Sequence, residues 1–115
     1  MALVSLFHVA SYQTSDDALL GFFRSASNAL NPGGLFVFDY WYGPAVLSDR
    51  PHARERQETA EDGTSVARKT EPVMHFEENV VDVNYAFNIR RGGVEHLFRE
   101  THRMRYLFVP ELRMY

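Results

Sequence analysis

The sequence predicts an α/β fold in which a βαβ unit is followed by an antiparallel three-stranded sheet. Two apolar runs of strand length, at 2–9 and 35–40, flank a segment with helical spacing at 16–30. A run at 79–89 then alternates apolar and polar residues with a period of two, which is typical of a half-buried antiparallel strand. With 115 residues, the chain is long enough for one compact domain and too short for two.

The first strand is predicted at 2–9, because ALVSLFHV is a continuous apolar run and such runs are typical of strands covered on both faces. A helix is expected over 16–30, and either Thr14 or Ser15 can cap its N-terminus. The apolar residues of this helix recur at helical spacing and are Leu19, Leu20, Phe23, Ala26 and Leu30.

The motif NPGG ends this helix, because Asn31 tolerates left-handed backbone and Pro32 cannot continue the hydrogen-bond ladder. The run GLFVFDY then predicts a second buried strand at 35–40. A strand, a helix and a returning strand form a right-handed unit with parallel strands in nearly all cases. Residues 1–42 are therefore predicted to be a βαβ unit.

The rest of the chain changes pattern. The polar, Arg-rich segment 43–63 contains the breakers GP and RP and is predicted to be a loop. The segment 64–109 is predicted to be the antiparallel sheet, with strands at 64–74 and 79–89 and a third strand after the turn RRGG. The third strand places on one face His96, Phe98, His102, Met104 and Tyr106.

Composition excludes several classes of function. The formal net charge is -3 and the basic residues form no stripe, so a nucleic-acid partner is not expected. The chain has no cysteine, which removes disulfides and thiolate metal sites and is compatible with a cytoplasmic protein. The N-terminal run MALVSLF is far below the roughly 18 apolar residues of a membrane span, so no membrane partner is expected.

Histidine spacing predicts no metal site. His96 and His102 share a face, but six residues of strand separate them by roughly 20 Å. No H-E-x-x-H or G-x-S-x-G motif is present, so zinc-protease and serine-hydrolase chemistry are not indicated.

A candidate site lies where the two parallel strands end, because open α/β sheets bind ligands at the carboxyl ends of their strands. These ends present His8, Tyr12, Asp39, Tyr40, Trp41 and Tyr42. The alternative is that the aromatic residues only plug the edge of the sheet. His102 has a similar alternative, because a histidine on an apolar face is often a hydrogen-bonded core residue.

Three stretches together, LFHVASYQT, LNPGGLFVFDYWYG and ETHRMRYLFVPEL, resemble the later half of a class I S-adenosylmethionine-dependent methyltransferase. The most telling is the L-x-P-G-G-x-F-x-F-D run at 30–39, and the arrangement is similar to that of amino-sugar N-methyltransferases. The resemblance implies a partial Rossmann-like unit, a fragment of a methyltransferase domain, that begins at the family's fourth strand. The family's glycine-rich loop and ribose-binding acidic residue would then lie upstream, so the resemblance implies weak or absent cofactor binding by these residues alone.

The resemblance also implies roles for individual residues. Leu6, Phe7 and His8 match the segment that lines the methionine end of S-adenosylmethionine. Tyr12 matches a polar ring near the transferring methyl group, and His102 matches the histidine on the last strand of the inserted sheet. These two are the candidate catalytic residues.

Trp41 and Tyr42 match the wall of the acceptor pocket. The function that the resemblance implies is methyl transfer to an amine or hydroxyl group of a small, sugar-like molecule, with this chain inactive alone. The alternatives are a non-enzymatic dimerisation module and a small-ligand-binding module that uses the aromatic crevice.

One convincing helix cannot cover both faces of two buried strands. An uncovered face would form an apolar patch larger than soluble monomers usually tolerate. The sequence therefore predicts a homo-oligomer.

Overall fold

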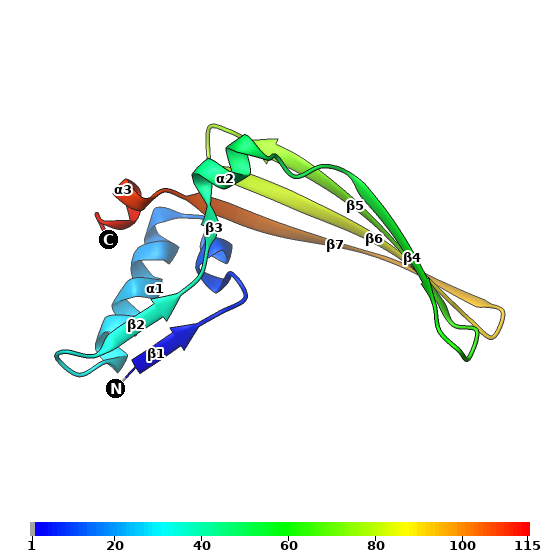
Figure 1. The fold of residues 1–115 in the computed structure, drawn as a ribbon, viewed down its shortest axis with the longest axis horizontal. Helices are drawn as coiled ribbons and strands as arrows, with labels where there is room; N and C mark the ends of the chain where they lie inside the picture. The colour runs from blue at the N-terminus through cyan, green and yellow to red at the C-terminus, as the bar shows by residue number, and fades with distance from the viewer. Residues whose placement is uncertain (1) are drawn as a thin grey trace.

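The computed structural model describes residues 2–115 and shows a small βαβ body from which a long, twisted sheet extends (Figure 1). The elements are β1 (Ala2–Ser5), η1 (Val9–Tyr12), α1 (Asp16–Ala29), β2 (Leu35–Phe38), β3 (Trp41–Tyr42), α2 (Gly43–Ser48), β4 (Arg54–Thr59), β5 (Ser65–His75), β6 (Val80–Arg91), β7 (Val94–Leu107) and α3 (Val109–Leu112). The molecule measures 57 × 33 × 22 Å, and the sheet accounts for its length. Across 2–115, no helix is both long and apolar enough to cross a membrane.

The predicted βαβ unit is confirmed. β1 and β2 pair in parallel, with Leu3 opposite Phe36. α1 connects them and packs on one face of the pair, where the ring centroids of Phe23 and Phe38 lie 5.2 Å apart. The Ser15 hydroxyl accepts a hydrogen bond from the Ala18 N–H at 3.1 Å, which caps the helix as the sequence suggests.

The strand predicted at 2–9 is wrong in its second half, because β1 ends at Ser5. Phe7 and His8 adopt positive φ angles of 63° and 62°, and a 3-10 helix follows. The turn is held by tertiary contact, since the His8 N–H donates to Asp39 Oδ1 at 2.8 Å. β2 is also shorter than predicted and ends at Phe38.

The prediction that both faces of these strands are covered is also wrong within the chain. α1 covers the face that carries Phe36, whereas on the opposite face Val4, Leu35 and Val37 are 57%, 67% and 52% exposed. The unbroken apolar runs of β1 and β2 therefore show that both faces of these strands are apolar. Within the residues described, only one of the two faces is covered.

The larger sheet has the order β3-β7-β6-β5-β4, with β4 to β7 antiparallel and β3 parallel to β7. Two predictions need correction here. The inserted sheet has four antiparallel strands rather than three, and the predicted loop at 43–63 contains α2 and β4. Every residue of β4 is exposed and polar or charged, so the strand is held by backbone pairing to β5 and leaves no apolar alternation to read.

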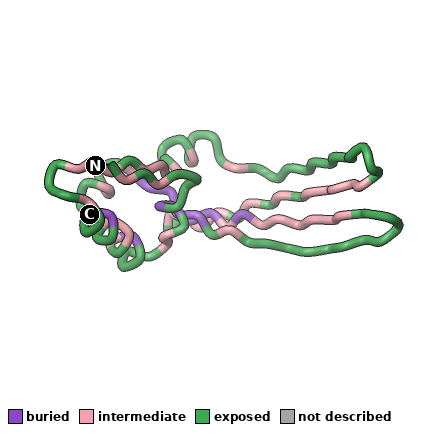
Figure 2. The backbone as a smooth tube through the Cα atoms, turned by 90° about the horizontal axis from the view of Figure 1, so that it is seen from below, coloured by how far each residue is buried: buried purple, intermediate pink, exposed green. Residues whose placement is uncertain are grey.

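The core lies where the long sheet joins the body. Val81, Val83, Met104 and Tyr106 are buried there and pack against partly buried side chains that include Trp41. Figure 2 shows buried residues concentrated at this junction and exposed residues along the hairpin ends. The body is therefore fixed to the sheet at one end, while the other end of the sheet projects into solvent.

The first prediction concerns Gly43 at the start of α2. A Cβ atom at this position would lie 2.6 Å from Phe108 Cζ, far inside van der Waals contact. We expect Gly43→Ala to lower the free energy of unfolding by about 1 to 3 kcal/mol, because overpacking forces the ring aside. Urea denaturation measures this change. Gly21→Ala is the control: nothing lies within 4 Å of a Cβ there, and alanine favours the α1 interior, so it should not destabilise.

Candidate functional site

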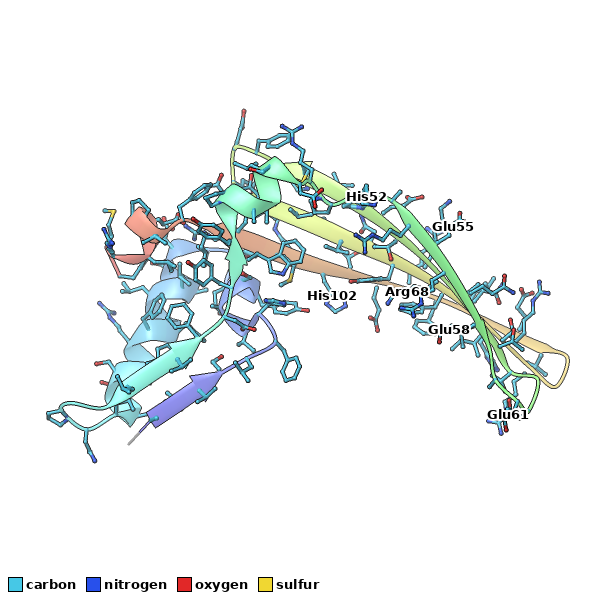
Figure 3. All side chains as sticks on the ribbon, viewed as in Figure 1. His52, Glu55, Glu58, Glu61, Arg68 and His102 are labelled. Carbon is cyan, nitrogen blue, oxygen red and sulfur yellow. The ribbon has the colours of Figure 1, made fainter. Side chains whose placement is uncertain are left out.

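A cavity of about 290 Å³ lies between the turn after β1, β3 and the face of the long sheet that carries His102. Its lining residues are Phe7, His8, Tyr12, Trp41, Arg68, Val83, Tyr85, Phe87, Glu100, His102 and Met104. The pairing register explains this set: His102 lies opposite Val83 in β6, and Arg68 of β5 lies opposite Phe87. Figure 3 labels His102 and Arg68, which project from the same side of the sheet.

The closest polar contact in the cavity joins Tyr12 and His102. The Tyr12 hydroxyl lies 2.7 Å from His102 Nδ1, although 90 residues separate the two in sequence. η1 supplies the tyrosine and β7 supplies the histidine. The Tyr85 ring stands edge-on to the imidazole with centroids 5.3 Å apart, so His102 is bounded by tyrosines on two sides.

The second nitrogen of His102 also has a partner. His102 Nε2 lies 3.2 Å from Glu100 Oε2, and both side chains are partly exposed to the cavity. Tyr12, His102 and Glu100 thus form a continuous chain of hydrogen-bonding groups along one wall.

The opposite wall comes from the body. His8 Nδ1 lies 3.8 Å from Asp39 Oδ2, and the His8 and Trp41 rings meet edge-on with centroids 6.4 Å apart. The buried Ser11 hydroxyl accepts a hydrogen bond from the Trp41 N–H at 2.8 Å, which fixes η1 against β3. The carboxyl ends of β1 and β2 therefore meet at this site, as the sequence predicts.

The structure brings five of the nine predicted site residues to one cavity: Phe7, His8, Tyr12, Trp41 and His102. The other four, Leu6, Asp39, Tyr40 and Tyr42, do not line it. Tyr42 is 49% exposed because it alternates with Trp41 along β3 and so points away. His102 is not a buried core histidine, since its side chain is 36% exposed.

Sequence reasoning missed Arg68, Tyr85 and Glu100 as lining residues. The Arg68 guanidinium carbon lies 5.8 Å from the centre of the Tyr85 ring, a cation–π distance. Glu100 precedes His102 by two residues and therefore shares its face. That signal was present in the sequence, whereas the position of Arg68 depends on the pairing of β5 with β6.

Comparison with solved structures identifies the class of fold. A S-adenosylmethionine-dependent methyltransferase from Clostridium acetobutylicum ATCC 824 matches 98% of this chain with a TM-score of 0.77 and 21% identity, and the match covers 44% of that chain. The chain therefore has the fold of the matching part of such a methyltransferase, as the sequence resemblance predicts.

Two further similar structures are of methyltransferases whose names state the kind of acceptor. The sugar N-methyltransferase KedS8 from Streptoalloteichus sp ATCC 53650 matches 92% of this chain with a TM-score of 0.77 and 18% identity, over 41% of that chain. CalS10, a SAM-bound amino pentose methyltransferase from Micromonospora echinaspora, matches 98% with a TM-score of 0.75 and 17% identity, over 46% of that chain. The chain thus spans less than half the length of these proteins. No family model and no curated protein matches it by sequence.

Proposed function

We propose that this chain forms the acceptor side of a S-adenosylmethionine-dependent methyl transfer to an amine or hydroxyl group of a small, sugar-linked molecule. The observation that carries the proposal is the Tyr12–His102 hydrogen bond inside an aromatic cavity. The likeness to methyltransferase folds, two of them from enzymes named for sugar or amino pentose methylation, supports the same reaction class.

In methyl transfer, the main task of the protein is to position the acceptor atom against the methyl carbon. The sulfonium of S-adenosylmethionine already activates the methyl carbon, and in-line displacement needs the acceptor atom held behind it. An amine acceptor must attack in its neutral form, and a hydroxyl acceptor must lose a proton. Tyr12 and His102 supply the groups that can orient the acceptor and take that proton.

The cavity fits the reactive end of the cofactor better than the whole molecule. The aromatic side chains of Trp41 and Tyr85 line the cavity and suit a sulfonium cation, because aromatic rings attract positive charge. We propose that Phe7 and His8 border this end, and that Trp41 borders the acceptor. A volume of about 290 Å³ is at the lower limit for a small-molecule site, so the rest of the cofactor must be held elsewhere.

Weak cofactor binding is therefore the expected result for residues 1–115 alone. The sequence has no glycine-rich segment that follows a strand and opens a helix, the arrangement that binds nucleotide phosphates or a cofactor tail. We expect a dissociation constant for S-adenosylmethionine weaker than about 10 μM, equivalent to roughly -7 kcal/mol. Isothermal calorimetry measures it, and tighter binding would contradict the expectation.

A direct test of the activity supplies the remainder of a methyltransferase fold. In a chimera, this chain replaces the matching segment of KedS8, which it resembles over 92% of its own length. Transfer of a labelled methyl group to an amino-sugar acceptor is the expected result. A folded chimera that binds S-adenosylmethionine and the acceptor but transfers no methyl group would overturn the proposed function.

The second candidate function is a dimerisation module, and the uncovered face of β1 and β2 favours it. Val4, Leu35 and Val37 are each more than half exposed there, and burying such side chains contributes roughly 1.5 to 3 kcal/mol each. We expect self-association at micromolar concentration, with two-fold pairing the commonest form. Sedimentation velocity showing a monomer of 13.3 kDa would contradict this expectation. A Val37→Glu variant, exposed on the same face, should shift an oligomer towards monomer.

A further inference from the structure

We propose that Glu100 is a positioning residue that holds His102 in the tautomer with its proton on Nε2, leaving Nδ1 to accept the Tyr12 hydroxyl proton. The use of this arrangement in methyl transfer rests on the proposed function, whereas the tautomer is a property of the chain itself.

The pairing of Glu100 with His102 follows from strand geometry. The two residues are two apart in β7, so both side chains project from the face that lines the cavity. Glu100 Oε2 lies 3.2 Å from His102 Nε2. An ionised carboxylate can only accept hydrogen bonds, so this contact requires a proton on Nε2.

The consequence passes through the imidazole to Tyr12. A neutral imidazole carries one N–H, so a proton on Nε2 leaves Nδ1 with a free lone pair. The Tyr12 hydroxyl, 2.7 Å from Nδ1, must then be the donor. Because its proton points at the imidazole, the lone pairs of the Tyr12 oxygen are free to accept an N–H or O–H from a molecule in the cavity.

The opposite tautomer would reverse every step. With the proton on Nδ1, the imidazole would donate to the Tyr12 oxygen and occupy one of its lone pairs. Tyr12 would then present its own proton to the acceptor atom, which must instead lose one. Arg68 and His8 also face the cavity, but the side-chain hydrogen bonds of His102 within residues 2–115 are those to Tyr12 and Glu100. Glu100 is thus the group that decides between the two tautomers.

The experiment is a long-range ¹H–¹⁵N NMR spectrum of the full chain labelled with ¹⁵N-histidine, at a pH of about 8.5, where an ordinary imidazole is neutral. His102→Gln identifies the His102 signals among the five histidines of the sequence. We expect Nε2 to carry the proton in the parent chain. In Glu100→Leu the population with the proton on Nδ1 should rise several-fold.

Glu95→Leu is the matched control. Glu95 lies on the same strand and bonds Asn88 and Arg90 rather than a histidine, so the His102 tautomer should not change. Glu100→Gln keeps the side-chain size and serves if Glu100→Leu does not fold. Its neutral amide can either accept from or donate to Nε2, so the shift should have the same direction and a smaller size.

The proposal is overturned if His102 in the parent chain carries its proton on Nδ1, or if neither Glu100 variant changes the tautomer ratio. Neither outcome depends on methyl transfer, so the proposed function can fail while this inference holds. In the methylating chimera, Glu100→Leu should lower kcat about 10-fold with KM unchanged, because proton transfer is affected and acceptor binding is not.

Discussion

In the chimera proposed above, replacing Tyr12 by phenylalanine is expected to lower the rate of methyl transfer by about 100-fold, the lower end of the range for general acid–base groups. The lower end applies because the sulfonium already activates the methyl carbon. The variant removes the hydroxyl that lies 2.7 Å from His102 Nδ1 and keeps the ring that lines the cavity. The effect should fall on kcat rather than on cofactor affinity, since the proposed function places the hydroxyl at the reacting atom.

Single-turnover kinetics of the methylating chimera measure this effect. Tyr42→Phe is a matched control, because Tyr42 is an exposed tyrosine of β3 that does not line the cavity. Removal of the Tyr42 hydroxyl should leave kcat within a factor of about two, as for other surface substitutions. Equal turnover in Tyr12→Phe and the parent would remove Tyr12 from the reaction.

Replacing Arg105 by methionine is expected to lower the free energy of unfolding by about 1 to 3 kcal/mol, mainly through its contact with the partly buried Glu111. Arg105 is 7% exposed and joins α1 and α3 to the sheet. From β7 its guanidinium donates to Asp16 Oδ1 of α1 at 3.0 Å and to Glu111 Oε2 of α3 at 2.8 Å. The substitution removes both bonds and leaves the two carboxylates without their cation.

Urea denaturation measures the change as a shift in midpoint with an unchanged slope. Arg90→Met is the control, because the ion pair of Arg90 with Glu95 is exposed and such pairs contribute little to stability. Similar losses in the two variants would mean that burial adds nothing to the Arg105 contacts.

Asp16, which bonds Arg105, makes the stability of the chain depend on pH. Hydrogen bonds from the Tyr115 hydroxyl and from Arg105 hold the pKa of Asp16 below its ordinary value of 3.8. Its stabilising contribution is therefore complete above that value and is lost as the pH falls through the lower, folded-state pKa. In Arg105→Met this acid-side loss should become smaller but persist, because the Tyr115 bond remains. Urea denaturation at pH values from about 2 to 6 tests whether the free energy of unfolding falls with pH in this way.

The sequence predicted much of the candidate site because strand ends and strand alternation are local patterns. Parallel pairing of two apolar runs places His8 and Trp41 at one edge, and alternation in β7 places His102 on the face that meets it. Tyr42 does not line the cavity, since adjacent residues of a strand point to opposite sides. Arg68 was missed because its place in the cavity comes from cross-strand register, which depends on contacts between segments far apart in sequence.

The sequence by itself determined the elements that local patterns of apolar residues mark. These are the βαβ unit with its capped helix and the hairpin of β6 and β7. Tertiary structure alone decided the rest. β1 ends at Ser5 because the His8 N–H donates a hydrogen bond to Asp39 in the turn that follows. β4 forms because its backbone pairs with the edge of β5. Tyr12 meets His102 because the buried Ser11 hydroxyl fixes η1 against β3. The physical reason is the same in each case: a hydrogen bond to a distant partner stabilises a local conformation that the apolar pattern does not encode.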